Sequence, residues 1–144
     1  MIRQLTLQDY TGNNLNVKGY TIVLIHGSFC GHCKSFAPIF QQFGQLLQQN
    51  KSPIQLASIQ IDSNNPQEAE LGQRIDKMLN FHLKGVPTLL LYGKNGGLIG
   101  EIQSNMTLAD LTQRFLKSSK TSLPPQSQFQ QPYHVSQAQP RKYQ

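Results

Sequence analysis

The chain has 144 residues, of which 38% are hydrophobic, and its formal net charge at pH 7 is +6. This length is enough for one domain whose core needs neither a metal nor disulfides to fold. The basic residues of the first 117 positions stand singly, without the clustering that a nucleic-acid-binding face requires. No segment approaches the ~18–20 consecutive apolar residues of a membrane span. We therefore expect neither nucleic-acid binding nor membrane insertion.

The first part of the chain predicts strands on both sides of a long helix. Strands are predicted at 2–7 and 15–17 (both weak signals), 20–26 and 54–61. The run YTIVLIH at 20–26 is nearly continuously apolar and β-prone, which is typical of a strand covered on both faces. After it, apolar residues recur at helical spacing to about residue 49. Pro38 lies within this helix and predicts a kink.

The second part predicts two more helices and a hairpin. Asn65-Pro66 followed by Glu68 is typical of an N-cap, a first-turn proline and a capping-box acid, for a helix reaching about His82. Strands are predicted at 88–92 and 97–103, joined by a turn at 94–97, and a last helix runs from the cap Thr107 to near Lys117. The order β-β-α-β-α-β-β-α predicts a parallel strand pair with a right-handed crossover, followed by an antiparallel portion.

The segment from about residue 118 differs in composition from the rest. It is rich in glutamine, holds half of the chain's prolines and has no acidic residue. Such a sequence buries too little apolar surface to offset the entropy cost of ordering. We therefore expect a folded domain over 1–117 and a disordered tail over 118–144.

The two cysteines of the chain, Cys30 and Cys33, stand where a predicted strand ends and a helix begins. Cys30 is expected at the N-cap, exposed, where unpaired amides and the helix dipole favour a thiolate. Cys33 is expected one turn further on, facing inward and within disulfide reach. A His32 imidazolium favours the Cys30 thiolate further, and Gly31 keeps the turn uncrowded. Cys30 is therefore the candidate nucleophile.

The two cysteines also allow two other interpretations. They can be small buried hydrophobic residues, although the position and the intervening Gly-His argue against this. They can also be half of a zinc site, but no second C-x-x-C follows, and His26, His32 and His82 are isolated. No metal and no cofactor beyond the dithiol is therefore expected. The N-terminus lacks the apolar run of a signal peptide, so we expect a cytoplasmic protein, or a virion protein if its source is a virus.

The segment SFCGHCKSFAPIFQQF resembles the active-site segment of the thioredoxin superfamily, and CGHC is similar to that of protein disulfide isomerase domains. GVPTLLLYGKNGG resembles the segment that carries the family's cis-proline, which is then Pro87, and SIQIDSNNP resembles the central strand and its exit. The resemblance covers about residues 18–117. It implies the thioredoxin fold, an α/β fold with a central mixed β-sheet flanked by helices.

The resemblance also implies a thiol–disulfide oxidoreductase. Cys30 would attack a protein disulfide, and Cys33 would resolve the mixed disulfide, leaving a Cys30–Cys33 disulfide for a reductase or oxidase to recharge. The substrate groove it implies is lined by Phe29, Gly31, Val86, Pro87 and Thr88. Phe29 stands where the family usually has Trp. We expect a monomer. The rival interpretation is a binding module, or a packaged structural protein, with little turnover.

The chain departs from the family pattern at several positions. Leu24 stands where the family commonly has a buried acid, and Ser58 stands where many members have its lysine partner. Met106 and Ser104 replace a mobile arginine and a groove glycine. These departures predict that Cys33 resolves mixed disulfides slowly. His32 and the missing acid predict a reduction potential nearer the about −180 mV of isomerases than the about −270 mV of thioredoxin.

Two histidines near the cysteines each have two possible roles. His32 is either a group that stabilises the thiolate or a solvated surface residue. His26 is more often a packed residue than an acid–base catalyst at such a position.

Overall fold

The structure is a computed structural model that describes residues 2–79, 86–102 and 106–117. Its strands are β1 (Ile2–Gln4), β2 (Tyr10–Thr11), β3 (Asn14–Leu15), β4 (Thr21–His26), β5 (Gln55–Gln60), β6 (Thr88–Tyr92) and β7 (Leu98–Ile102). Its helices are the 3₁₀ helix η1 (Leu7–Asp9), α1 (Gly31–Gln49), α2 (Pro66–Leu79), α3 (Leu108–Thr112) and a π-helical turn η2 (Gln113–Lys117). The predicted order of the main strands and helices is confirmed.

Five strands form one mixed sheet in the order β1-β5-β4-β6-β7. β4 lies at its centre and pairs in parallel with β5, from Thr21 opposite Gln55 to His26 opposite Gln60. β6 runs antiparallel to β4 and forms the predicted hairpin with β7. Because β4 and β5 are parallel, the segments that follow their last residues leave the sheet at the same edge.

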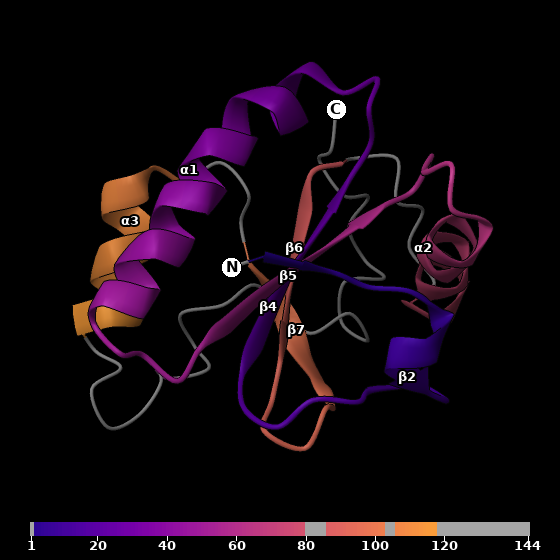
Figure 1. Cartoon of the computed structure of the whole chain (residues 1–144), viewed down its shortest axis with the longest axis horizontal. Coiled ribbons are helices and arrows are strands. Elements are labelled where there is room, and N and C mark those ends of the chain that lie inside the picture. The colour runs from indigo at the N-terminus through magenta and orange to yellow at the C-terminus, as the bar shows by residue number, and fades with distance from the viewer. Residues whose placement is uncertain (1, 80–85, 103–105, 118–144) are drawn as a thin grey trace, which may run out of the picture.

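Helices cover both faces of the sheet (Figure 1), as the family resemblance implied. The side chains of Ile22 and Leu24 pack in the cluster under α1 and α3, whereas Val23 and Ile25 pack in the cluster under α2. Alternate residues of a strand point to opposite faces, so a strand covered on both sides has to be apolar at every position. The continuous apolar run of β4 is explained by this burial.

The helix α1 begins at the dithiol segment and packs along its whole length. Cys30 is its N-cap, with extended backbone angles, and the buried face carries Phe36, Phe40, Phe43 and Leu47. The ring centroids of Phe43 and Phe115 are 6.2 Å apart, so α1 packs against the C-terminal helical segment. Pro38 lies inside the helix as predicted, and the kink remains a prediction.

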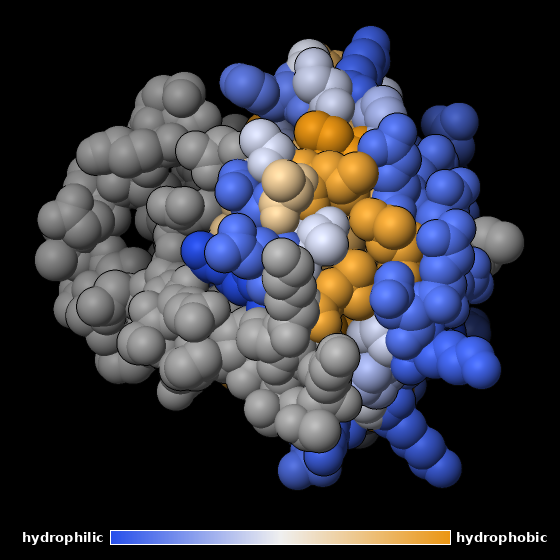
Figure 2. All heavy atoms as spheres, turned by 90° about the vertical axis from the view of Figure 1, so that its left-hand side faces the viewer, coloured by the Kyte–Doolittle hydropathy of each residue, from blue (hydrophilic) through white to orange (hydrophobic). Residues whose placement is uncertain are grey.

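Half-buried apolar side chains gather on the outside of the α1 and α3 layer. Figure 2 views this face and shows apolar residues in a band beside polar ones. Ile39, Leu108 and Leu116 pack partly buried against the cluster beneath these helices. Among the described residues, no helix is both long enough and apolar enough to cross a membrane.

The N-terminal segment differs from the prediction of a strand over 2–7. β1 ends at Gln4, and Thr6 then caps the helix η1 in a capping box with the carboxylate of Asp9. The short β2 and β3 form a separate hairpin, which accounts for the weak strand signal at 15–17. Local capping therefore prevails over the apolar pattern of this segment.

Glu68 is not a capping-box acid, and this prediction is wrong. The residue is 4% exposed, and its carboxylate accepts the backbone N–H of Gln60 at 2.7 Å. β1 ends at Gln4, opposite Ser58, so the N–H of Gln60 on that side has no strand partner. Glu68 supplies the missing acceptor. The N-cap assignment of Asn65 is supported, because its side chain accepts the N–H of Gln67 at 2.9 Å.

Some predicted features lie outside the described residues. They are His82 at the expected end of α2, Ser104, and the proposed tail at 118–144.

Candidate active site

The two cysteines lie at the edge of the sheet where β4 ends. The chain leaves β4 at His26, turns through residues 27–29 and enters α1. The turn is closed by the backbone N–H of Cys30, which donates to the carbonyl of Gly27 at 3.3 Å. Because Cys30 is the N-cap residue, its side chain lies in front of the helix amides that have no intrahelical acceptor.

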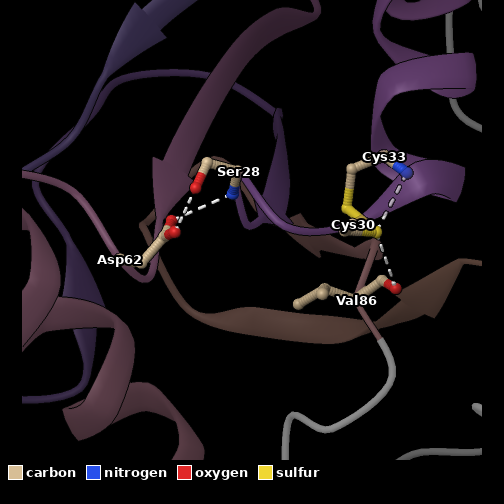
Figure 3. The surroundings of a disulfide bond; sticks show 5 residues. All are labelled: Ser28, Cys30, Cys33, Asp62 and Val86. Carbon is tan, nitrogen blue, oxygen red and sulfur yellow. Dashed lines mark hydrogen bonds between the residues drawn. A yellow bond between two sulfur atoms is a disulfide. The ribbon is translucent and has the colours of Figure 1, made fainter.

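Cys30 and Cys33 are joined by a disulfide, with their Cα atoms 5.2 Å apart (Figure 3). The backbone N–H of Cys33 points at Cys30 Sγ at 3.0 Å. Cys33 is 4% exposed and faces inward, as predicted. The prediction that Cys30 is exposed is wrong, because the residue is only 8% exposed. The carbonyl oxygen of Val86, from the segment before β6, lies 3.3 Å from Cys30 Sγ and helps to cover it.

Two backbone groups act on Cys30 Sγ in opposite directions once the disulfide is reduced. The N–H of Cys33 and the helix N-terminus stabilise a thiolate. The Val86 carbonyl can only accept a hydrogen bond, so it stabilises the protonated thiol. The nucleophilicity of Cys30 at a given pH therefore depends on the balance between these two contacts.

The peptide bond between Val86 and Pro87 is cis, as the resemblance implied for Pro87. Pro87 is buried, and Thr88, which begins β6, is 1% exposed. The antiparallel pairing of β6 with β4 places this segment beside the end of β4, with Thr88 opposite Ile25. The structure therefore brings residues 86–88 to the dithiol.

The other predicted groove residues, Phe29 and Gly31, are the chain neighbours of Cys30. Phe29 is 68% exposed, and its ring lies over Gly27, where an added Cβ would be 2.6 Å from the ring carbon Cε2. Gly31 has open space around it, since an added Cβ would meet no atom within 4 Å. His32 is exposed in the first turn of α1. Its effect on the thiolate remains a prediction.

Ser28 and Asp62 belong to the site but were not identified from the sequence. Ser28 donates its backbone N–H to Asp62 Oδ1 at 3.0 Å and its hydroxyl to Asp62 Oδ2 (Figure 3). The side-chain amide of Gln60 also donates to Oδ1, at 3.1 Å. These hydrogen bonds, chiefly those from Ser28, lower the pKa of Asp62 to about 2. The available signal was that Asp62 follows a strand predicted to be parallel to the one before Cys30.

His26 is half-buried at the end of β4. Burial lowers the pKa of its imidazole below the usual value, and the negative charges of Glu68 and Asp62 oppose this shift without cancelling it. The neutral form is therefore favoured relative to an exposed histidine. This environment is compatible with either role that the sequence left open for His26.

Three of the positions that depart from the family pattern, Leu24, Ser58 and Met106, are buried. Leu24 is paired in register with Ser58 on β5, and Leu24 and Met106 are both buried in the cluster under α1 and α3. Within the described residues, no side chain hydrogen-bonds to Cys33 Sγ, and no group of three or more His, Cys, Asp or Glu side chains could hold a metal.

Comparisons with known proteins agree with this architecture. A sequence model of the Thioredoxin family matches residues 2–117. A protein disulfide-isomerase of Datisca glomerata is 29% identical over 110 residues, 76% of this chain and 20% of that protein. Protein disulfide-isomerase A4 of Bos taurus is 32% identical over 91 residues, 62% of this chain and 13% of that protein. The chain thus spans about a fifth or less of these relatives' lengths.

A solved structure shows the same fold at low sequence identity. The first thioredoxin domain of mouse Protein disulfide-isomerase A4 superposes with a TM-score of 0.60 at 20% identity, covering 85% of this chain and 78% of that domain. The family match extends over most of the chain and includes the disulfide-bonded CGHC, the cis-proline and the mixed sheet. The chain belongs to the thioredoxin family.

Proposed function

We propose that this protein is a thiol–disulfide oxidoreductase that exchanges disulfides of other proteins through Cys30 and Cys33. The observation that carries the proposal is the position of Cys30 Sγ, disulfide-bonded to Cys33 and 3.0 Å from the first-turn N–H of Cys33. A sulfur at this position is stabilised as a thiolate and has a second sulfur within bonding reach. A structural disulfide also needs the second sulfur, but it does not need a stabilised thiolate.

The reaction in the reducing direction consists of two exchanges. The Cys30 thiolate attacks one sulfur of a substrate disulfide, that S–S bond breaks, and the other substrate sulfur leaves as a thiolate that takes up a proton. Cys33, once deprotonated, attacks Cys30 Sγ in the mixed disulfide and releases the second substrate thiolate. Two electrons have then passed to the substrate, and the Cys30–Cys33 disulfide remains. A reductase restores the dithiol. In the oxidising direction, the same steps run in reverse and an oxidase recharges the site.

The proposed substrate-binding surface consists of Phe29, Gly31 and Val86, and the predicted groove residues Pro87 and Thr88 are buried, so they can only support it from beneath. Its support is the contact between Val86 and Cys30 and the open space at Gly31. A peptide approaching Cys30 has to pass the backbone of Val86, which lies beside the reacting sulfur. The exposed ring of Phe29 offers an apolar surface on the approach.

We infer further that Cys33 resolves mixed disulfides slowly. Cys33 is buried, and Leu24, which stands where the family commonly has a buried acid, is apolar. Removing a proton from a buried thiol creates a charge that apolar surroundings do not stabilise. A mixed disulfide with native Cys33 is then expected to persist long enough to be detected.

Dithiothreitol-driven reduction of insulin, followed by single-turnover trapping, tests the proposal. A Cys30→Ser variant should lose essentially all activity, whereas a Ser35→Ala control on the exposed side of α1 should keep the wild-type rate. Wild-type activity in the Cys30→Ser variant would contradict the function.

Acid quenching followed by mass spectrometry should show a mixed disulfide in the wild type. Resolution too fast to trap would contradict slow release but leave the function standing.

A binding module that captures its partner covalently is the second candidate, and the buried Cys33 is the observation that favours it. Turnover separates the two, because a capture module stops after one equivalent of substrate.

The monomeric state and the cytoplasmic location remain predictions, which sedimentation and cell fractionation can test.

A further inference from the structure

A carboxylate outside the dithiol holds the turn that carries it. Both oxygens of Asp62 accept hydrogen bonds from Ser28, one from the backbone N–H at 3.0 Å and one from the hydroxyl (Figure 3). We call this pair the Asp62–Ser28 clamp. It joins two segments that are 34 residues apart in the chain, the exit of β5 and the turn between β4 and α1.

The clamp acts at the middle of a short turn. Ser28 stands between Gly27, whose carbonyl accepts the N–H of Cys30, and Phe29, whose ring lies over Gly27. Fixing Ser28 therefore limits the movement of the whole turn from His26 to the N-cap. The placement of Cys30 Sγ relative to the Cys33 N–H and the Val86 carbonyl depends on that turn.

We propose that Asp62 is a positioning residue for thiol–disulfide exchange, which holds Cys30 in its reactive geometry by clamping Ser28. This proposal depends on the proposed function. Asp62 takes part in no bond-making step, and its effect passes through Ser28 to the turn. Its side chain remains ionised under physiological conditions, because the hydrogen bonds from Ser28 keep the pKa of Asp62 at about 2.

Loss of the clamp has a chemical consequence that differs from a loss of stability. A mobile turn lets Cys30 Sγ leave the helix N-terminus, so its thiolate is stabilised for a smaller fraction of the time. A mobile turn also presents the mixed disulfide at Cys30 to Cys33 in a wider range of orientations. Misplacement of reacting groups by about 1 Å can slow a reaction by up to about 100-fold. We expect a loss of about tenfold for an exposed turn that keeps its other contacts.

The test compares the full-length wild type with Asp62→Ala, Ser28→Ala, the double variant and the control Asp110→Ala. Asp110 is matched because it is also an exposed carboxylate that accepts a backbone N–H at 3.0 Å, that of Thr107, but on α3. Three quantities are measured: the rate of insulin reduction, the pH profile of Cys30 alkylation, and the equilibrium of the dithiol with glutathione. Thermal unfolding is recorded for each variant.

The clamp predicts a distinct pattern. Asp62→Ala should reduce insulin about tenfold more slowly than Asp110→Ala. Its alkylation profile should move to higher pH and its dithiol should become more reducing, because the thiolate loses stabilisation. Ser28→Ala should have a smaller effect, since the backbone N–H of residue 28 remains. The double variant should be no worse than Asp62→Ala alone, which is the signature of two groups acting as one.

Two results would overturn the proposal. One is equal activity, alkylation profile and glutathione equilibrium for Asp62→Ala and Asp110→Ala, which would leave Asp62 a purely structural role. The other is additive losses in the double variant. Failure of the proposed function is recognised separately, because the wild type and Asp110→Ala would then both lack disulfide exchange.

Discussion

At Cys30, one backbone donor and one backbone acceptor compete for the same sulfur. The donor, the N–H of Cys33, belongs to the helix that the residue caps, and the acceptor belongs to Val86, 56 residues further along the chain. The first contact follows from the local sequence and the second from the pairing of β6 with β4. The reactivity of the Cys30 sulfur therefore depends partly on a contact that local sequence patterns do not specify.

Gly27 is the residue that lets the ring of Phe29 lie against the turn. In Gly27→Ala, the new Cβ would be 2.6 Å from the ring, so the exposed ring has to swing away. We expect KM for insulin to rise several-fold, while the rate with a small aromatic disulfide stays the same. Gly97→Ala is the control, because a Cβ there meets nothing within 4 Å. An unchanged KM in Gly27→Ala would show that Phe29 does not contact substrate.

His26 predicts a pH dependence of stability. Because burial lowers the folded-state pKa of its imidazole, the unfolded chain binds the proton more readily. Its contribution to the free energy of unfolding is fully present above the unfolded pKa of about 6.5 and is lost as the pH falls through the folded pKa. Urea unfolding at pH 8 and pH 5.5 should show lower stability at pH 5.5. The difference should shrink in His26→Gln, and an equal difference in both proteins would contradict this account.

At the scale of elements, the start of α2 is tied to the sheet by a buried carboxylate. Glu68 accepts the N–H of Gln60 where β1 no longer accompanies β5. Glu68→Ala leaves that N–H unsatisfied and should lower the free energy of unfolding by about 1–3 kcal/mol. Glu68→Gln keeps an acceptor and should lose less.

The matched control for this prediction is Glu70→Ala, an exposed residue on the same helix. Surface substitutions of this kind usually change stability by no more than about 0.5 kcal/mol. Chemical denaturation measures all three variants. Equal decreases in the free energy of unfolding for Glu68→Ala and Glu70→Ala would mean that the contact with Gln60 does not stabilise the fold.

At the scale of the whole molecule, we propose that the folded unit ends near residue 117. The family match over 2–117 and the change of composition at 118 both support this boundary. A chain of residues 1–117 should unfold at the same temperature as the full chain and reduce insulin at a similar rate. A melting temperature several degrees lower would contradict the boundary.

The control for the truncation is a chain that stops at residue 106. It loses α3 and η2, and with them the buried side chains of Leu111 and Phe115. Removing one buried large side chain costs about 2–5 kcal/mol, so the loss of two is comparable to the total stability of a typical domain. This shorter chain is expected not to fold.

Much of the architecture follows from short-range patterns in the sequence. The apolar run of β4, the helical spacing after it, the N-cap at Cys30 and the capping box at Thr107 were all predictable. Each depends on residues within one or two turns of one another, where periodicity and capping rules operate. The cis bond before Pro87 was predicted from a family resemblance rather than from such a rule.

The sequence by itself determined where the dithiol stands, at the junction of a buried strand and a helix. Only the tertiary structure decided what surrounds it. Val86 covers Cys30, Asp62 accepts hydrogen bonds from Ser28, and the carboxylate of Glu68 accepts the N–H of Gln60 instead of capping its own helix. These contacts join segments that are adjacent only because of the strand order β1-β5-β4-β6-β7 and the early end of β1. Local propensities do not encode which strand ends share an edge, since that depends on how all the apolar faces are buried at once.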